Sequence, residues 1–197
     1  MDINTLRDQI VTAFEDKWDC NDLAHRQNHF ENVFKCGMKI NEHLNYEFDP
    51  KLIMFSAYFH DLFAWSRVNH HELALHFIQG TDHPLIIDNL NPAEQSTVAW
   101  ACYQHRASFR GDFKSRFSAL INSADRELPG DVGHMLNRAI LYRKKHFPMM
   151  SDDQCMEESV KHLKEKFGRD GYARYPEMYL EVFGDQLEQQ RNIIMNM

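Results

Sequence analysis

The chain has 197 residues, of which 43% are hydrophobic and 26% are charged, so it can bury a full-sized core in one domain. Its formal net charge of -7 argues against a binder of nucleic-acid polymers or of anionic membranes, because both need a surplus of basic residues. The sequence has no apolar run of the roughly 20 residues that a membrane span needs, and its first residues lack the pattern of a signal peptide. Its four cysteines form no C-x-x-C pair, so we expect a cytoplasmic protein with reduced thiols.

Two amphipathic helices are expected at the start of the chain. The second of them runs from Asn28 to Leu44, and His29 begins its apolar stripe. A histidine at such a position is more often a core or capping residue than a metal ligand, so the role of His29 depends on its partners. The first helix is indicated by apolar residues at helical spacing: Ile3, Leu6, Ile10, Phe14 and Trp18.

A third helix should begin at Asp49-Pro50, with aspartate as the N-cap and proline at the first helical position. From Leu52 onward it is apolar on nearly every side, which is typical of the central helix of a bundle. His60 and Asp61 end this apolar run. A buried aspartate is costly without a cation, an arginine or several hydrogen-bond donors beside it. The pair is therefore either part of a metal site or a helix end that faces solvent.

The next two helices have start signals of one kind. Asn69 is followed after three residues by Glu72, the spacing of a capping box, and predicts a helix from His70 to Gln79. Asn91-Pro92 repeats this signal at the start of the following helix.

Polar residues also occupy inward positions further along the chain. His105 lies at the end of the apolar stripe of the helix that begins near residue 91, and basic residues follow it. Asp125 lies one turn after Ile121 on the apolar side of the next helix, where packing alone would favour an apolar residue.

The final third of the sequence is helical and carries no motif of its own. A capping box at Ser151–Gln154 predicts the start of one of its helices. No segment alternates with period two, and no low-complexity linker divides the chain. We therefore predict an all-α fold with a single domain over residues 1–197.

Histidine and aspartate thus follow one another in the order H…HD…D on three helices, and in this the chain resembles the HD-domain superfamily of metal-dependent phosphohydrolases. The resemblance spans about residues 20–130 and implies a helical bundle of the HD-domain type, with residues 131–197 as a helical extension. It rests on three segments: His25-Arg26-Gln27-Asn28-His29-Phe30-Glu31-Asn32-Val33, Ala57-Tyr58-Phe59-His60-Asp61-Leu62 and Ser123-Ala124-Asp125-Arg126.

The resemblance implies a divalent metal held by His29, His60, Asp61 and Asp125. It also implies hydrolysis of a phosphate ester in a small phosphorylated metabolite, such as a nucleotide or deoxynucleotide. Imidazole and carboxylate ligands suit Mn, Fe, Co, Ni or Zn, whereas Mg is less natural beside two histidines. Such an ion lowers the pKa of its bound water and draws charge from phosphoryl oxygens.

Two versions of this chemistry match the sequence. In the mononuclear version, a histidine directly before a glutamate is a general acid, which makes His71, Glu72 and Asp61 the candidate catalytic residues. In the binuclear version, a phosphodiesterase of cyclic or signalling nucleotides, His70 and His105 bind a second ion. Both patterns are present, so the sequence does not choose between one ion and two.

Four arginines near the proposed ligands could bind phosphate oxygens, because a guanidinium group binds them in bidentate fashion. The expected partner is a small phosphorylated molecule, and neither a nucleic-acid polymer nor a membrane is expected. A non-catalytic nucleotide-binding module is a third reading, and the sequence indicates no oligomeric state. The four arginines are Arg67, Arg106, Arg110 and Arg126.

Overall fold

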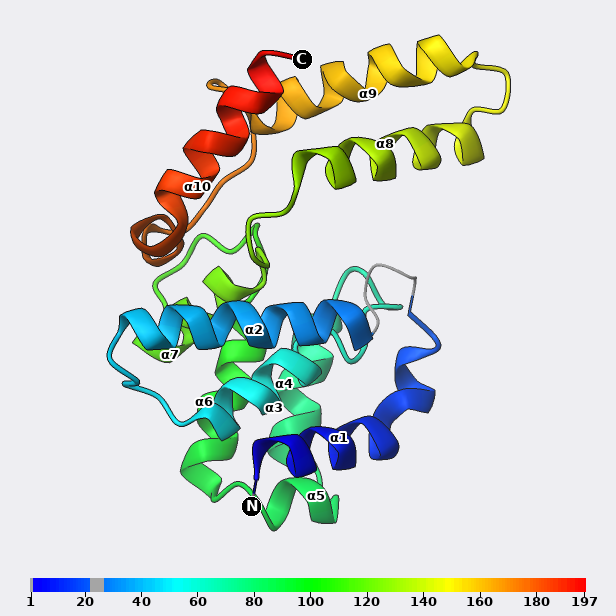
Figure 1. Cartoon of the computed structure of the whole chain (residues 1–197). Helices are drawn as coiled ribbons and strands as arrows, with labels where there is room; N and C mark the ends of the chain where they lie inside the picture. The colour runs from blue at the N-terminus through cyan, green and yellow to red at the C-terminus, as the bar shows by residue number, and fades with distance from the viewer. Residues whose placement is uncertain (1, 22–26) are drawn as a thin grey trace. The chain divides into compact units, whose positions relative to one another are not determined.

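A computed structural model describes residues 2–21 and 27–197, and within these ranges it contains ten helices and no strand (Figure 1). The predicted all-α class is confirmed. The helices are α1 (Ile3–Trp18), α2 (Gln27–His43), α3 (Pro50–Phe59), α4 (His70–Gly80), α5 (Pro84–Ile87), α6 (Pro92–Gln104), α7 (Arg116–Ala124), α8 (Val132–His146), α9 (Asp152–Phe167) and α10 (Glu177–Met195).

The chain divides into two compact units. The first comprises Met1–Leu128 and Pro176–Val182, and the second comprises Pro129–Tyr175 and Phe183–Met197. The division after Leu128 falls close to the expected start of the helical extension. The return of the segment Pro176–Val182 to the first unit was not expected from the sequence, and this segment includes the first turns of α10.

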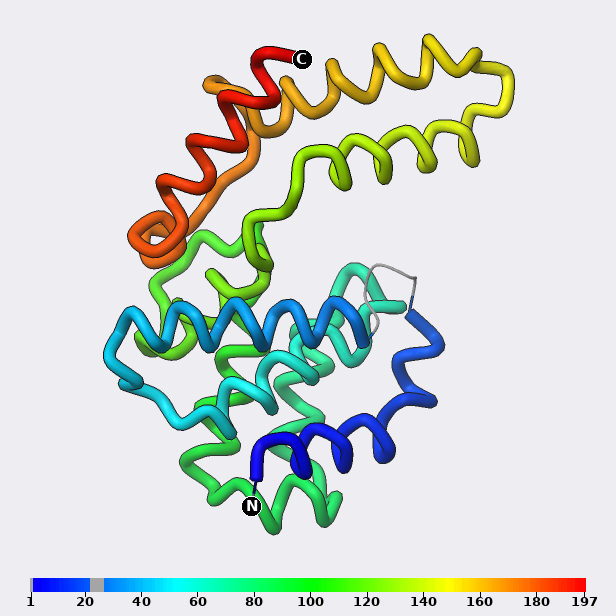
Figure 2. The backbone as a smooth tube through the Cα atoms, viewed as in Figure 1, coloured from blue at the N-terminus to red at the C-terminus, as the bar shows by residue number. Residues whose placement is uncertain are grey.

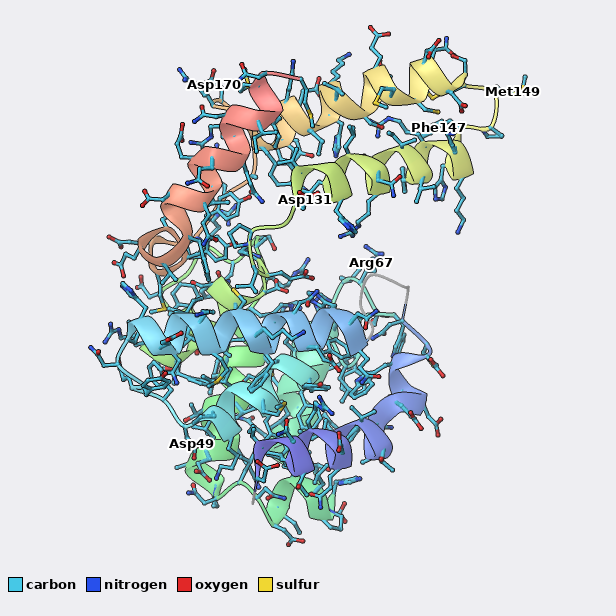
Figure 3. All side chains as sticks on the ribbon, viewed as in Figure 1. Asp49, Arg67, Asp131, Phe147, Met149 and Asp170 are labelled. Carbon is cyan, nitrogen blue, oxygen red and sulfur yellow. The ribbon has the colours of Figure 1, made fainter. Side chains whose placement is uncertain are left out.

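The core of the first unit is built around α3. Every residue from Ile53 to Phe59 is buried, as expected of a central helix, and α3 packs against α1, α2, α6 and α7. Aromatic side chains fill part of this core, and the rings of Phe14 and Phe59 meet edge to face with their centroids 4.9 Å apart. Asp49, labelled in Figure 3, caps α3 by accepting a hydrogen bond from the backbone N–H of Lys51.

The approach of α2 to α3 depends on a glycine. A Cβ atom added to Gly37 would lie 2.8 Å from Cγ2 of Ile53 and would also touch Ala124 and Leu120 of α7. Because Cγ2 belongs to a β-branched side chain with few rotamers, it cannot move away freely. Gly37 therefore allows three helices to meet closely.

The helix starts agree with the predictions except at α4. Asn91 and Ser151 form the predicted capping boxes of α6 and α9. Asn69 precedes α4 but makes no side-chain cap, so the capping box predicted with Glu72 is wrong. Its side-chain oxygen instead accepts a hydrogen bond from the hydroxyl of Ser66 at 2.5 Å.

The second unit has a small core of its own. Val132, Leu163 and Ile194 are buried together in it. Figure 2 shows that the backbones of α8 and α9 run side by side, and these helices pack against each other. The turn that joins them carries Phe147 and Met149, both labelled in Figure 3, and both are exposed. In neither unit does the described part of the chain contain a helix long and apolar enough to cross a membrane.

We expect Gly37→Ala to lower the free energy of unfolding by up to about 2 kcal/mol. Overpacking against Ile53 costs about 1–3 kcal/mol, which outweighs the gain of about 1 kcal/mol in helix propensity. Gly184→Ala in α10 is the control, because nothing lies within 4 Å of the added carbon. It should stabilise the protein by about 0.5–1 kcal/mol in urea denaturation. Equal effects of the two changes would contradict close packing at Gly37.

Candidate metal centre

All six predicted metal ligands lie at or beside helix ends in the first unit. Three of them, His60, His105 and Asp125, are C-cap residues, where the exposed carbonyl groups give the helix end a partial negative charge that favours a cation. Asp61 follows α3 directly, and the N-terminal turns of two helices supply His29 (α2) and His70 (α4).

The first group of ligands converges on one point. Nε2 of His29 lies 3.1 Å from Nε2 of His60. Oδ1 of Asp125 lies 3.4 Å from each of these nitrogens. Oδ2 of Asp61 lies 3.7 Å from the nitrogen of His29 and 3.5 Å from that of His60. Four side chains from three segments of the chain thus direct two nitrogen and two oxygen atoms into one small space.

The second group shares a carboxylate with the first. Oδ1 of Asp61 lies 3.3 Å from Nε2 of His70 and 3.3 Å from Nε2 of His105. The two nitrogens are themselves 3.3 Å apart. Within each group the ligand atoms all lie within 4.8 Å of one another. The two oxygens of Asp61 therefore serve different groups, and this carboxylate bridges them.

In three of the histidines, the hydrogen bond at Nδ1 determines the protonation of Nε2, which faces the other ligands. Nδ1 of His60 faces the carbonyl oxygen of Ala57 at 2.9 Å, and Nδ1 of His105 faces that of Cys102 at 2.5 Å. Nδ1 of His29 faces a carboxylate oxygen at 2.6 Å. Because these partners are acceptors, each Nδ1 carries the proton, and the neutral ring presents a lone pair at Nε2. His70 is different: its buried Nδ1 has no hydrogen-bond partner among the described residues.

The donor set fits a divalent cation. Lone pairs of neutral imidazoles and carboxylate oxygens all accept hydrogen bonds, so a proton or a cation must lie between them. Metal ions such as zinc lie about 2.0–2.2 Å from these ligands, which separates neighbouring ligand atoms by about 3.0–3.5 Å. The distance of 3.3 Å in the second group and most of those in the first, from 3.1 to 3.5 Å, match this spacing, and the distance of 3.7 Å between His29 and Asp61 is slightly longer. Buried His and Asp groups that could bind a metal ion are thus present, as the sequence led us to expect.

The charges in the site shift the pKa values of its members. Burial disfavours the charged form of His29, but hydrogen bonds with Asp125 and Glu127 outweigh it and raise the pKa of His29 to about 10. Burial likewise opposes ionisation of Asp61, yet the neighbouring His60 and His105 hold its pKa below its usual range. The pKa of His70 falls to about 4, because the ring is partly buried and lies beside His105. Without a metal, a proton on His29 therefore stabilises the first group.

Two buried asparagines hold the ligand-bearing turns in place. Asn21 donates from Nδ2 to the carbonyl of Asp61 at 2.9 Å and accepts at Oδ1 from the N–H of Trp65. Asn122 of α7 donates to the carbonyl groups of Gln104, His105 and Arg106, at the C-terminal end of α6 and just after it. Neither role could be predicted from the sequence, because partners 16 to 44 positions away in the chain leave no local signal.

Five of the six ligands line a cleft of about 490 Å³, and the sixth, His60, is fully buried. Arg67, labelled in Figure 3, and Arg106 line this cleft, so two of the four predicted phosphate ligands face it. Arg126 contacts Asp125 at 3.2 Å and is mostly buried. Arg110 instead donates to the backbone carbonyls of Ala107 and Phe109. The lining residues are His29, Asp61, Ala64, Arg67, His70, His105, Arg106, Ala107, Ser108 and Asp125.

The structure separates the two histidines at the start of α4. His70 belongs to the second ligand group, whereas the ring of His71 packs against Tyr103 with centroids 5.2 Å apart. Glu72 is exposed on the same helix. His71 and Glu72, predicted as catalytic residues, are not among the residues that line the cleft. Two residues of the first family-like segment, His25 and Arg26, lie outside the described residues.

We expect metal binding at pH 7.5 to release about one proton per first-group ion, because His29 is protonated below its pKa of about 10 and must lose that proton to bind. The apparent affinity should therefore rise with pH, by up to about tenfold per pH unit for each proton displaced. Calorimetric titration of Mn²⁺ in two buffers of different ionisation enthalpy measures this release. Identical heats in the two buffers would contradict it.

We also expect Asp61→Asn to lower the metal content by more than one ion per chain, because the same carboxylate serves both ligand groups. His105→Gln should remove only the second ion. Elemental analysis of the two purified variants beside the wild type gives the counts. A full complement of metal in the Asp61 variant would refute the bridging role of this carboxylate.

Comparisons of the chain with protein-family models, with curated proteins and with solved structures found no match. The likeness to the HD-domain superfamily therefore rests on the order of the ligand residues in the sequence. What the protein does has to be argued from the chemistry of the site.

Proposed function

We propose that this protein is a metal-dependent phosphohydrolase with two ions in one cleft, acting on a small phosphorylated metabolite such as a nucleotide. The observation that carries this proposal is the position of Asp61, whose two oxygens face two separate groups of imidazole nitrogens. A shared carboxylate would hold two ions close together, and two-metal phosphoester hydrolysis uses ions about 3.5–4 Å apart.

The ligand types suit Mn, Fe, Co, Ni or Zn. Ions bound here would lower the pKa of a coordinated water and offset negative charge on the phosphoryl oxygens. The protein's own contribution is to hold the ligands rigidly and to bind the substrate. Arg67 and Arg106 line the cleft next to the ligands, and each guanidinium group can bind phosphate oxygens there.

The placement of His70 favours the binuclear version over the mononuclear one. Nε2 of His70 lies within 3.3 Å of Asp61 and of His105, as a ligand to a second ion would. The low pKa of His70, about 4, keeps its ring neutral and able to bind metal at physiological pH. His71 contacts Tyr103 and does not line the cleft, so it is poorly placed as a general acid.

The substrate is small and anionic in this proposal. A cleft of about 490 Å³ is of the size of ordinary small-molecule sites. The net charge of -7 would repel a nucleic-acid polymer at long range. Nucleoside monophosphates and cyclic or linear dinucleotides are therefore the substrates to test first.

We expect His70→Ala to reduce nucleotide hydrolysis by about 10–100-fold or more, as losses of metal-site residues commonly do. The adjacent His71→Ala is the matched control and should keep activity within about threefold of the wild type, because the ring of His71 packs against Tyr103 and does not line the cleft. The assay follows loss of each nucleotide by chromatography, with Mn²⁺ added to metal-depleted protein.

Three outcomes of this assay separate the readings. Loss of activity in the His71 variant with activity retained in the His70 variant would support the mononuclear mechanism. Saturable nucleotide binding without product, in metal-loaded wild type, would instead support the non-catalytic binding module. Hydrolysis of phosphodiesters but not of monoesters would point to a phosphodiesterase of cyclic or signalling nucleotides.

A further inference from the structure

We propose that Glu127 is a positioning residue that holds the imidazole of His29 for metal binding, and that Tyr179 of α10 holds Glu127 in place. This inference rests on the metal centre of the proposed function. Neither residue belongs to the two ligand groups, and neither was singled out in the sequence.

The carboxylate of Glu127 is held by two residues on one face of α2. Oε1 lies 2.6 Å from Nδ1 of His29, a short contact of the kind seen in charge-assisted hydrogen bonds. Oε2 accepts a hydrogen bond from Nδ2 of Asn32 at 3.3 Å. Since both oxygens are engaged, the carboxylate cannot rotate without losing a contact. The ring of His29 is therefore fixed with Nε2 directed at the other ligands of the first group.

The backbone of Glu127 is unusual for a glutamate. Its φ angle is 58°, in the left-handed region that glycine and asparagine adopt more readily. A single residue in this conformation lets the chain turn sharply after Asp125, the C-cap of α7. The N–H of Glu127 bonds to the carbonyl of Ala124 at 2.8 Å. A strained residue that also contacts a metal ligand is the pattern expected where backbone strain serves a site.

A tyrosine from near the other end of the chain secures this turn. The hydroxyl of Tyr179 donates to the carbonyl oxygen of Glu127 at 2.7 Å, across 52 positions of sequence. Tyr179 is only 1% exposed and lies in the segment Pro176–Val182, which belongs to the first unit. The first turns of α10 thus reach the metal centre through two hydrogen bonds in series, Tyr179 to Glu127 and Glu127 to His29.

The chemical consequence concerns the orientation and basicity of the ligand. A carboxylate bound at Nδ1 fixes which nitrogen of a metal-binding histidine carries the proton and makes the other nitrogen a stronger donor to the metal. Without Glu127, the ring of His29 can rotate or shift its proton to Nε2, and either change removes a ligand from the first group.

The test uses metal-depleted full-length protein titrated with Zn²⁺. Glu127→Asn suits the left-handed backbone but is too short to reach His29, so the fold should be kept while affinity for the first ion falls about 10–100-fold. Glu127→Gln keeps the length and loses the charge, and should give a smaller loss. Tyr179→Phe should also lower the affinity, by less than Glu127→Asn. The control is Glu157→Gln, which removes the same charge at an exposed position and should have no effect.

Two further readouts distinguish positioning from general destabilisation. In zinc-loaded wild type, the Nδ1 proton of His29 should give a downfield NMR signal protected from exchange, and Glu127→Asn should abolish it. Affinity for the second ion, bound by His70 and His105, should stay within about threefold of the wild type.

Unchanged affinity for the first ion in Glu127→Asn would overturn the proposal. An equal loss at both sites, together with a lower melting temperature, would also overturn it, because it would make Glu127 a general structural residue. A wild type that binds no metal at all would instead overturn the metal centre on which the proposal rests.

Discussion

The candidate metal centre brings together more hydrogen-bond acceptors than donors. Nε2 atoms of His29, His60 and His105 and the oxygens of Asp61 and Asp125 face one another at 3.1 to 3.7 Å, and in their neutral or ionised forms all of them are acceptors. Only protons or cations can make such an arrangement stable in a buried place. Without a metal ion, a proton on His29 meets this requirement, which is why the pKa of His29 is raised and the pKa values of Asp61 and Asp125 are lowered.

The fold orients two of the histidine rings by the same local hydrogen bond. His60 and His105 each end a helix, and the Nδ1 atom of each bonds to the carbonyl of the residue three positions earlier. That bond uses a carbonyl that the end of a helix leaves unpaired, and it fixes the ring with Nε2 pointing away from the helix. His29 lies near the start of a helix, where no such carbonyl is available, and Glu127 takes the place of the acceptor. Each of the three rings is thus fixed by a hydrogen bond at Nδ1.

Much of the first unit could be predicted from local patterns. The start of α3 at Asp49-Pro50 and the burial along that helix follow from its own residues. The candidate ligands could also be named, from histidine and aspartate at the inward ends of apolar stripes together with the resemblance to the HD-domain superfamily. The capping role of Asn69 was predicted wrongly, since Ser66 occupies its side-chain oxygen in the folded chain. The short helix α5 and the supports of the site, Asn21 among them, could not be predicted, because their partners are distant in sequence or their signals are too brief.

The sequence by itself therefore determined most of the helices, the all-α class and a set of residues able to bind a metal. It did not decide between His70 and His71, because adjacent residues at a helix start differ in direction by about 100° and only the packing of α4 against α6 decides which one faces inward. The tertiary structure also decided that Asp61 is shared by two groups, since this depends on where His70 and His105 meet it. Glu127 and Tyr179 acquire their roles in the same way, through contacts made across 98 and 52 positions of the chain.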